Sequence, residues 1–469
     1  MILRHRRLSR RARKHLLRSC EGLASAYCKR SFHNFTFHPT TVALPGVTGI
    51  GSSPDPAEDQ PLLPVPDPYA VLRNRDLVLY LTGRFVASLG QQMLTVAVGW
   101  ELYERTHSAL ALGLVGLTQM VPMLLFTLPA GHLADNHERK RIVVLMTAVG
   151  AGASLGLTLI SFFQAHVVWT YLCLFIAGSA RTFLWPASSA FLPHLVSRQE
   201  FSRAVTWSSG SFQLSSVAGP AASGALLALT GHAAAVYALN TAASLICLGL
   251  ISLVRSRHVV AEPQEMTLKS LIAGFHFVFA SRIILGTITL DLFAVLLGGA
   301  TALLPIYSKD ILHAGPRGLG FLQAALPLGS LLCALILAHR PPMQKAGPTL
   351  LWAVAGFGVA TIGFGLSRSF ALSFLMLFVC GFLDNISVVV RHTLVQLLTP
   401  DEKRGRVSAV NSLFIGTSNE LGGFESGFVA QFFGPIFSVV SGGIGTLFVV
   451  VAVALLFPQI RKVGRLDAA

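Results

Sequence analysis

Long runs of apolar residues constrain this chain more than any other feature, because few folds can accommodate them. A helix that crosses a membrane needs about 20 predominantly apolar residues, each rising about 1.5 Å through about 30 Å of hydrocarbon. Strands of a membrane β-barrel alternate apolar and polar residues over about ten positions, whereas these runs are continuous. We therefore predict an all-α membrane protein with twelve transmembrane helices, at about residues 77–103, 109–134, 141–163, 167–192, 202–229, 233–254, 283–307, 317–338, 347–366, 370–397, 406–432 and 435–457.

The composition and the placement of basic residues agree with such a fold. Apolar residues make up 53% of the chain and charged residues 12%, with a mean hydropathy of +0.63. Cytoplasmic loops of membrane proteins carry an excess of Lys and Arg. Most of the 36 Lys and Arg residues fall on the side of the N-terminus, and the opposite side holds only Arg105, Lys309, Arg317 and Arg368. Both termini are therefore predicted to be cytoplasmic.

Residues 1–68 form a basic extension before the first apolar run. Lys and Arg are concentrated in residues 1–30, and residues 39–68 are rich in Pro, Gly, Ser and Asp, which is typical of a disordered linker. A net charge of +15 raises the question of nucleic acid, but the extension lacks a folded module or aromatic platforms for it. We expect contact with membrane lipid and no nucleic-acid partner. An organelle transit peptide, or a start codon placed too early, also fits.

The chain contains two related halves. An offset of 203 residues places Gly219 on Gly422 and Gly224 on Gly427, in the fifth and eleventh apolar runs. Each half is expected to form one bundle of six helices. The predicted parts are an extension at 1–68, an N-terminal bundle at 69–254, a cytoplasmic linker with an amphipathic helix at 255–282, a C-terminal bundle at 283–458 and a cytoplasmic tail at 459–469.

A short loop between the second and third runs carries a motif, Gly131, Asp135, Arg139, Lys140 and Arg141. Glycine allows two helices to approach closely, and an acid can pair with a base or cap a helix N-terminus. The spacing resembles the loop signature of the major facilitator superfamily of transporters, and the resemblance covers about Tyr69 to Val463.

Two positions depart from that signature, because Asn136 replaces a base and Glu138 replaces a glycine. A pair between Asp135 and a base, or a helix N-terminus that it caps, would latch one conformation of the transporter. The alternative is that the basic cluster marks only the cytoplasmic side of the membrane, in which case Asp135 would be dispensable.

The fifth run contains Gly219, Pro220 and Gly224, and this segment is similar to the glycine-proline motif of exporters in the superfamily. Small residues let a neighbouring helix pack closely, and a proline inside a helix removes a backbone donor. Ordinary packing of small residues is the alternative. Other segments, such as residues 84–90 and 186–193, resemble the branch that contains the enterobactin exporter and the transmembrane secretion effectors. That resemblance implies a bacterial inner-membrane exporter of small molecules, such as siderophores or drugs, and a monomer.

Ionisable residues inside the apolar runs are candidate functional residues, because a charge at the centre of a membrane helix costs at least about 2.5 to 3.5 kcal/mol. We expect one acid, Asp384 first, to bind a proton in exchange for substrate while an arginine pairs with that acid or with an anionic substrate. Asp384 and Arg391 lie seven residues apart, so they are expected to face one cavity. Fixed ion pairs that tie helices together are the alternative. The candidates are Arg84, Arg181, Asp291, Asp384, Arg391, Glu420 and Glu425.

Several other functions find no support in the sequence. No Gly-Lys-Ser/Thr phosphate loop or His-Glu-x-x-His pair is present. A Gly-x-Ser-x-Gly sequence occurs at residues 152–156, but it lies inside an apolar run and not at the strand-to-helix turn of a nucleophile elbow, so an enzyme is not expected. The His residues show no ligand spacing, and we expect no metal and no cofactor, with a proton gradient as the energy source. An importer of the same fold, or a membrane receptor or scaffold that moves no solute, remains the alternative to an exporter.

Overall fold

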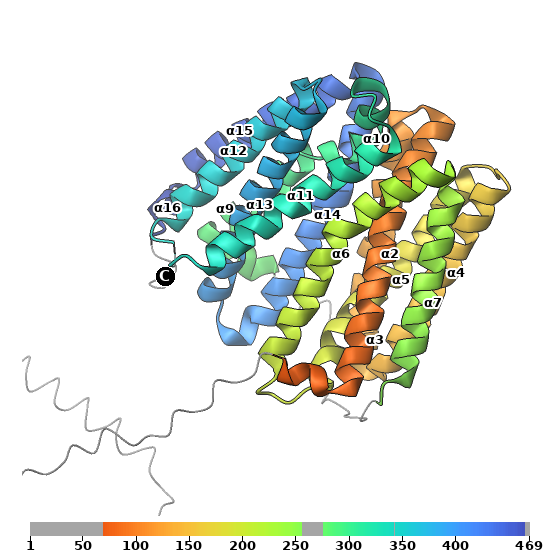
Figure 1. The fold of residues 1–469 in the computed structure, drawn as a ribbon. Helices are drawn as coiled ribbons and strands as arrows, with labels where there is room; N and C mark the ends of the chain where they lie inside the picture. The colour runs from red at the N-terminus through yellow and green to blue at the C-terminus, as the bar shows by residue number, and fades with distance from the viewer. Residues whose placement is uncertain (1–68, 256–274, 342, 465–469) are drawn as a thin grey trace, which may run out of the picture. The chain divides into compact units, whose positions relative to one another are not determined.

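The computed structural model describes residues 69–255, 275–341 and 343–464. The predicted extension, most of the predicted linker and residues 465–469 lie outside this part of the chain. The first half contains six long helices, α2 (Arg75–Thr106), α3 (Ala109–Asn136), α4 (Arg139–Phe162), α5 (Val168–Phe191), α6 (Phe201–Thr230) and α7 (Ala233–Leu253). The second half contains α9 (Arg282–Leu297), α11 (Gly315–Ala338), α12 (Ala346–Leu366), α13 (Phe370–Leu398), α14 (Asp401–Phe433) and α15 (Pro435–Leu456) (Figure 1).

These helices confirm the prediction of an all-α membrane fold. Ten helical segments of the described residues are long and apolar enough to cross a membrane. The two long helices outside that set, α2 and α14, carry charged residues in their terminal turns, such as Arg75, Asp76 and Arg105 in α2. Short elements complete the chain, η1 (Ala70–Arg73), η2 (Leu192–His194), η3 (Ala300–Leu303), α10 (Leu304–Ile306), η4 (Tyr307–Ile311) and α16 (Pro458–Lys462).

Local sequence signals explain where several helices begin and end. The Asn74 side chain accepts hydrogen bonds from the backbone N–H groups of Asp76 and Leu77, and so caps the start of α2. The hydroxyl of Ser108 caps α3 in the same way. At the end of α6, Gly231 adopts φ +71°, a left-handed conformation that glycine reaches without steric cost.

The seventh predicted span is interrupted, which the sequence analysis did not predict. α9 ends at Leu297, and the chain continues through Gly298 and Gly299 into η3, α10 and η4. A Cβ on Gly299 would lie 2.6 Å from the Gly422 carbonyl carbon and 2.8 Å from the Ser426 hydroxyl oxygen of α14. The break therefore lies where two backbones approach more closely than any side chain would allow.

The two halves meet along two helix pairs, α6 with α11 and α3 with α14. A Cβ on Gly224 would lie 2.9 Å from the Gly320 Cα, and a Cβ on Gly427 would lie 2.6 Å from the Gly113 Cα. The glycines at the repeat-related positions 224 and 427 thus make corresponding contacts, each with a glycine of the other half. Close approach without side chains maximises van der Waals contact between membrane helices.

All of these contacts lie toward one end of the bundle. We call the end where α2 begins and α3 ends the predicted cytoplasmic end, and the opposite one the far end. At the far end the Tyr103 hydroxyl donates to the Asp310 carboxylate, and the Ser108 hydroxyl donates to Gln431 at 2.8 Å. Both bonds join the first half to the second. The halves are therefore held together at the far end.

Nearer the predicted cytoplasmic end, Gly210 and Gly405 make no such contact with the other half. A Cβ on Gly210 of α6 or on Gly405 of α14 would have no atom of another element within 4 Å. Phe212 of α6 is 52% exposed. The last turns of the predicted linker, residues 275–280, are helical and pack on the same part of α14, where the rings of Phe275 and Phe414 lie 5.7 Å apart.

Candidate functional site

A cavity of about 480 Å³ lies where the two halves meet. Most of its wall comes from α2, α3, α4, α5, α6 and α7 of the first half, and the rest from η3, α10, α11 and α14 of the second. On α2 the wall extends from Arg84 to Gly99. At about 1.5 Å per residue, that stretch covers about 22 Å of depth, from near the predicted cytoplasmic end toward the far end.

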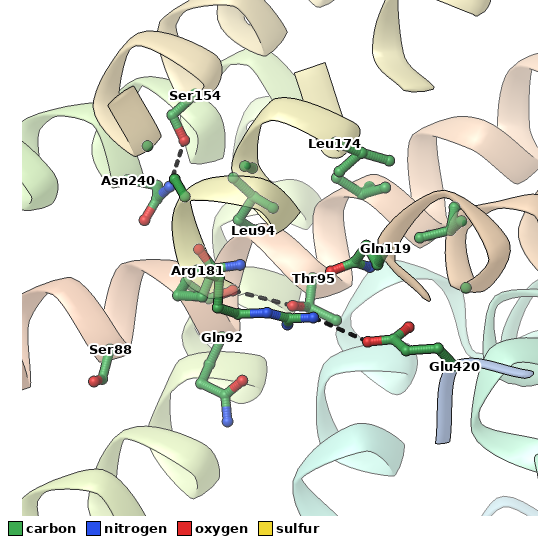
Figure 2. Close-up of a pocket in the computed structure, with 18 of the residues that line it drawn as sticks. Ser88, Gln92, Leu94, Thr95, Gln119, Ser154, Leu174, Arg181, Asn240 and Glu420 are labelled. Carbon is green, nitrogen blue, oxygen red and sulfur yellow. Dashed lines mark hydrogen bonds and ion pairs between the residues drawn. The ribbon is translucent and has the colours of Figure 1, made fainter. Parts of the chain in front are cut away.

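Amide and hydroxyl side chains line much of this cavity, although they interrupt otherwise apolar helices. The Gln92 amide donates to Ser216 at 2.9 Å, and the Asn240 amide donates to the Ser154 hydroxyl. These bonds fix the side chains within the first half, and Figure 2 shows both amides in the wall. Further polar groups in the lining are Ser88, Gln91, Thr95, Gln119, Thr147, Ser244, Thr301, Gln323 and Asn419. Such a wall can form hydrogen bonds with a polar solute from several directions.

An ion pair crosses the cavity from one half to the other. Arg181 of α5 donates through Nη2 to Oε1 of Glu420 in α14, at 2.9 Å (Figure 2). The Arg181 side chain is 50% exposed and that of Glu420 is 20% exposed. Two of the predicted candidates are thus brought together, and both face the space in which a solute would bind.

Arg84, another of the predicted candidates, also lines the cavity. No acidic residue among the described residues pairs with it. Glu420 is the only acid among the described residues that line the cavity, while Arg84 and Arg181 are both basic. The cavity therefore carries more positive than negative charge.

A second, much smaller pocket lies inside the second half and contains Asp384. Its volume is about 10 Å³, and residues of α9, α12 and α13 line it, including Asp291 and Ser387. A space of that size holds about one water molecule. Asp384 has no hydrogen-bond or ion-pair partner among the described residues. The repeat relates Asp384 to Arg181, so equivalent positions carry an acid in one half and a base in the other.

Arg391 takes a different partner from the one that the seven-residue spacing suggested. It forms an ion pair with Asp291 of α9, and the two side chains are only 3% and 7% exposed. The Nε and Nη1 atoms of Arg391 make no hydrogen bond of good geometry. This pair connects α13 to α9 beside the small pocket. Asp384 lines that pocket, and Arg391 does not.

The remaining candidate acid, Glu425, lies in neither pocket. Its carboxylate accepts a hydrogen bond of 3.4 Å from the hydroxyl of the neighbouring Ser426. Of the motif in the fifth run, Gly219 packs against α2, where a Cβ would lie 2.6 Å from the Gln92 Cβ, and Pro220 is buried inside α6. Gly224 makes the contact with α11 described above.

The loop motif binds within the first half. Lys140 donates to the Ser252 and Val254 carbonyl oxygens at 2.9 and 2.8 Å, and so caps the end of α7. Arg139 contacts His194 after α5, and Arg141 pairs with Glu138 at 2.6 Å. The other two residues of the loop motif are Gly131 and Asp135. Gly131 is buried in α3, and the side chain of Asp135 lies outside the described part of the structure.

Sequence reasoning missed the amides of the cavity wall. Gln92, Gln119, Asn240 and Gln323 each occur inside an apolar run, where an uncharged polar side chain also costs energy unless it finds a partner. Restricting the search to ionisable residues removed that signal. Among the described residues, no three His, Cys, Asp or Glu side chains gather closely enough to hold a metal ion.

Comparison with known proteins gives consistent matches over nearly the whole described chain. The family model of the transmembrane secretion effectors, a part of the major facilitator superfamily, matches residues 67–468. The enterobactin exporter EntS of Escherichia coli O1:K1 is 28% identical over 380 residues, which covers 81% of this chain and 91% of that protein. EntS of Shigella boydii serotype 18 matches to the same extent.

Solved structures of transporters share the fold. The nucleoside transporter NupG gives a TM-score of 0.64 at 14% identity, with 82% of this chain and all of that chain covered. A peptide transporter, POT, gives 0.66 at 10% identity over 82% of this chain and 95% of its own. A D-xylose-proton symporter gives 0.64 at 12% identity over 83% and 99%. At these identities the likeness concerns the fold alone.

Proposed function

Because the chain belongs to the transmembrane secretion effector family of the major facilitator superfamily, we propose that it exports siderophore-like small molecules in exchange for protons. It is an integral membrane transporter of a small molecule and not an enzyme. The observation that carries the proposal is the polar cavity of about 480 Å³ at the junction of two halves that touch at the far end. A cavity of this size suits a small-molecule ligand.

The direction of transport is supported by two observations. The relative that matches over 81% of this chain is named for export of enterobactin. The Gly219-Pro220 motif, which is similar to that of exporters, lies in α6, and this helix packs against α2 of its own half and against α11 of the other. We propose that the cavity takes up its solute from the cytoplasm and releases it when the contacts at the far end separate.

Asp384 is the proposed proton carrier. Its small pocket has room for about one water molecule, so it suits a proton and excludes a larger solute. A lone charged carboxylate away from water is costly unless it is paired, and Asp384 has no described partner, so proton binding would remove that cost. Asp291 shares the pocket but is already paired with Arg391, which makes it a structural acid in this proposal.

Sidedness and assembly belong to the same proposal. The basic residues 139–141 gather at the predicted cytoplasmic end, which is the side where membrane proteins concentrate Lys and Arg. We infer a bacterial inner-membrane location with both termini in the cytoplasm, contact with membrane lipid, and a monomer in which the two halves supply the whole transport path.

Uptake into inside-out membrane vesicles tests this function. Enterobactin is the first solute to try, and pH gradients of both signs should be imposed. Vesicles with an acidic interior should accumulate the solute, because protons leaving the lumen would drive it in, and vesicles with the Asp384→Asn variant should not. Accumulation driven by the opposite gradient would establish an importer. Solute binding without movement under either gradient would favour a receptor.

A further inference from the structure

The charges of the central cavity specify the kind of molecule that it binds. We propose that the solute is an anion that displaces Glu420 from Arg181 when it binds, with Arg84 as its second cationic contact. This inference rests on the proposed transport of a small molecule through the cavity. It assigns the charge class of that molecule, the two arginines that bind it and the glutamate that it displaces.

Arg84 brings a positive charge to the cavity. It lines the cavity, and none of the described acidic residues neutralises it. A cation removed from bulk water is costly unless an opposite charge accompanies it. The Arg84 side chain lies nine residues into α2, so a solute arriving from the predicted cytoplasmic end meets it early. A negatively charged solute would be attracted there, and a positively charged one repelled.

The bond between Arg181 and Glu420 leaves most of the guanidinium donors free for a solute. It uses one guanidinium nitrogen and one carboxylate oxygen, and the Arg181 side chain is half exposed. Ion pairs that are open to solvent contribute only about 0 to 1 kcal/mol, and a guanidinium has five N–H donors to offer. The Glu420 side chain is 20% exposed, so the pair is partly open to solvent. A carboxylate or phenolate of the solute could therefore take the place of Glu420 at little cost. The Asp291–Arg391 pair, 3% and 7% exposed, is not open to such an exchange.

Other groups of the cavity wall add hydrogen-bond donors and aromatic surface. Gln119 and Asn419 lie in the same wall and can donate hydrogen bonds, while Trp185 and Phe212 supply aromatic surface. That combination suits an anion carried on an aromatic ring. Arg181 belongs to one half of the chain and Glu420 to the other, as Figure 2 shows for their helices. Displacement of Glu420 would therefore break this ion pair between the halves when the solute binds.

Binding of two dyes with one ring system but opposite charge tests the proposal. Fluorescein is an anion and rhodamine 123 a cation, and fluorescence anisotropy reports the binding of each to the purified full-length protein. Fluorescein should bind more tightly than rhodamine 123. The Arg84→Gln and Arg181→Gln variants should each weaken the binding of fluorescein about tenfold or more. The Arg368→Gln variant replaces an exposed arginine outside the cavity and should change the affinity for fluorescein less than about twofold.

The Glu420→Gln variant distinguishes displacement of Glu420 by the solute from a permanent ion pair between Glu420 and Arg181. If the solute displaces Glu420, removing its charge should tighten fluorescein binding about three- to tenfold, a gain that misfolding cannot produce. The double variant Arg181→Gln/Glu420→Gln should bind like Arg181→Gln alone, because Glu420 acts only through Arg181. Weaker binding in Glu420→Gln would overturn the exchange. No fluorescein binding to the wild type up to about 1 mM, or equal binding of both dyes, would overturn the anion assignment.

The outcome stays distinct from that of the transport assay. Dye binding is measured in detergent without any gradient, so it does not depend on export or on protons. Exchange without gradient-driven accumulation would refute only the proposed function. Accumulation in vesicles without charge discrimination between the dyes would refute only this inference.

Discussion

A methyl group at position 427 should force the two halves of the chain apart at the far end. In Gly427→Ala the new Cβ would lie 2.6 Å from the Gly113 Cα and 2.7 Å from the Ala109 carbonyl oxygen. Both are backbone atoms, which cannot rotate away as a side chain can. Ordinary contact begins at about 3.4 Å, so α14 must move away from α3 by about 0.8 Å.

The cost of that clash sets the size of the effect. Overpacking by one methyl group typically costs about 1 to 3 kcal/mol. If the far end opens during transport, the clash is absent in the open conformation, and the population ratio should shift toward it by about five- to 150-fold. Gly405→Ala, in the same helix, is the matched control, because its Cβ would meet no atom of another element within 4 Å. Both variants share the intrinsic helix preference of alanine over glycine.

Distances between two spin labels at the far end measure this shift. His232→Cys on the first half and Arg368→Cys on the second are exposed positions for the labels, once the native cysteines are replaced. Gly427→Ala should add a longer distance component that Gly405→Ala lacks. Identical distance distributions for the two variants would refute the reasoning, because the glycine contact would then not hold the far end closed.

Two further predictions concern stability in detergent, measured by thermal unfolding. Asp291→Asn leaves Arg391 buried without a counter-charge and should destabilise the protein by about 3 to 5 kcal/mol. The apolar pair Asp291→Leu/Arg391→Met should restore much of that loss. An Asp291→Asn variant of unchanged stability would show that the ion pair is dispensable. Lys140→Met removes the cap at the end of α7 and should lower the stability by about 1 kcal/mol. Arg141→Gln is the control, because the Arg141 side chain is 85% exposed, and it should lower the stability by less than about 0.5 kcal/mol. Equal effects of the two variants would contradict the capping role of Lys140.

The fold was largely predictable, because each helix carries its own apolar run. α12, predicted at 347–366, spans Ala346–Leu366, and α15, predicted at 435–457, spans Pro435–Leu456. The break after α9 was missed because hydropathy does not record backbone approach. Gly298 and Gly299 are adjacent inside an apolar run, and Pro305 follows in the same run. These are local signals of a break, but the contact of Gly299 with Gly422 of a distant helix cannot be read from them.

The candidate site was predictable only in part. Ionisable residues inside the runs led to Arg181 and Glu420, but no spacing along the chain could pair residues of α5 and α14, which only the packing brings together. Helical spacing likewise placed Asp384 and Arg391 on one face, whereas α9 supplies the partner of Arg391 from outside that helix. The repeat identified Gly224 and Gly427 but not their partners in α11 and α3.

The central claim is that solute and proton move in opposite directions through this chain. Liposomes that contain the protein and a trapped pH-sensitive dye test it, when enterobactin is loaded inside at equal pH and the membrane voltage is clamped. Outward movement of the solute should draw protons in and acidify the lumen, and Asp384→Asn should abolish that change. Loss of the solute with a constant or rising lumen pH would contradict the account.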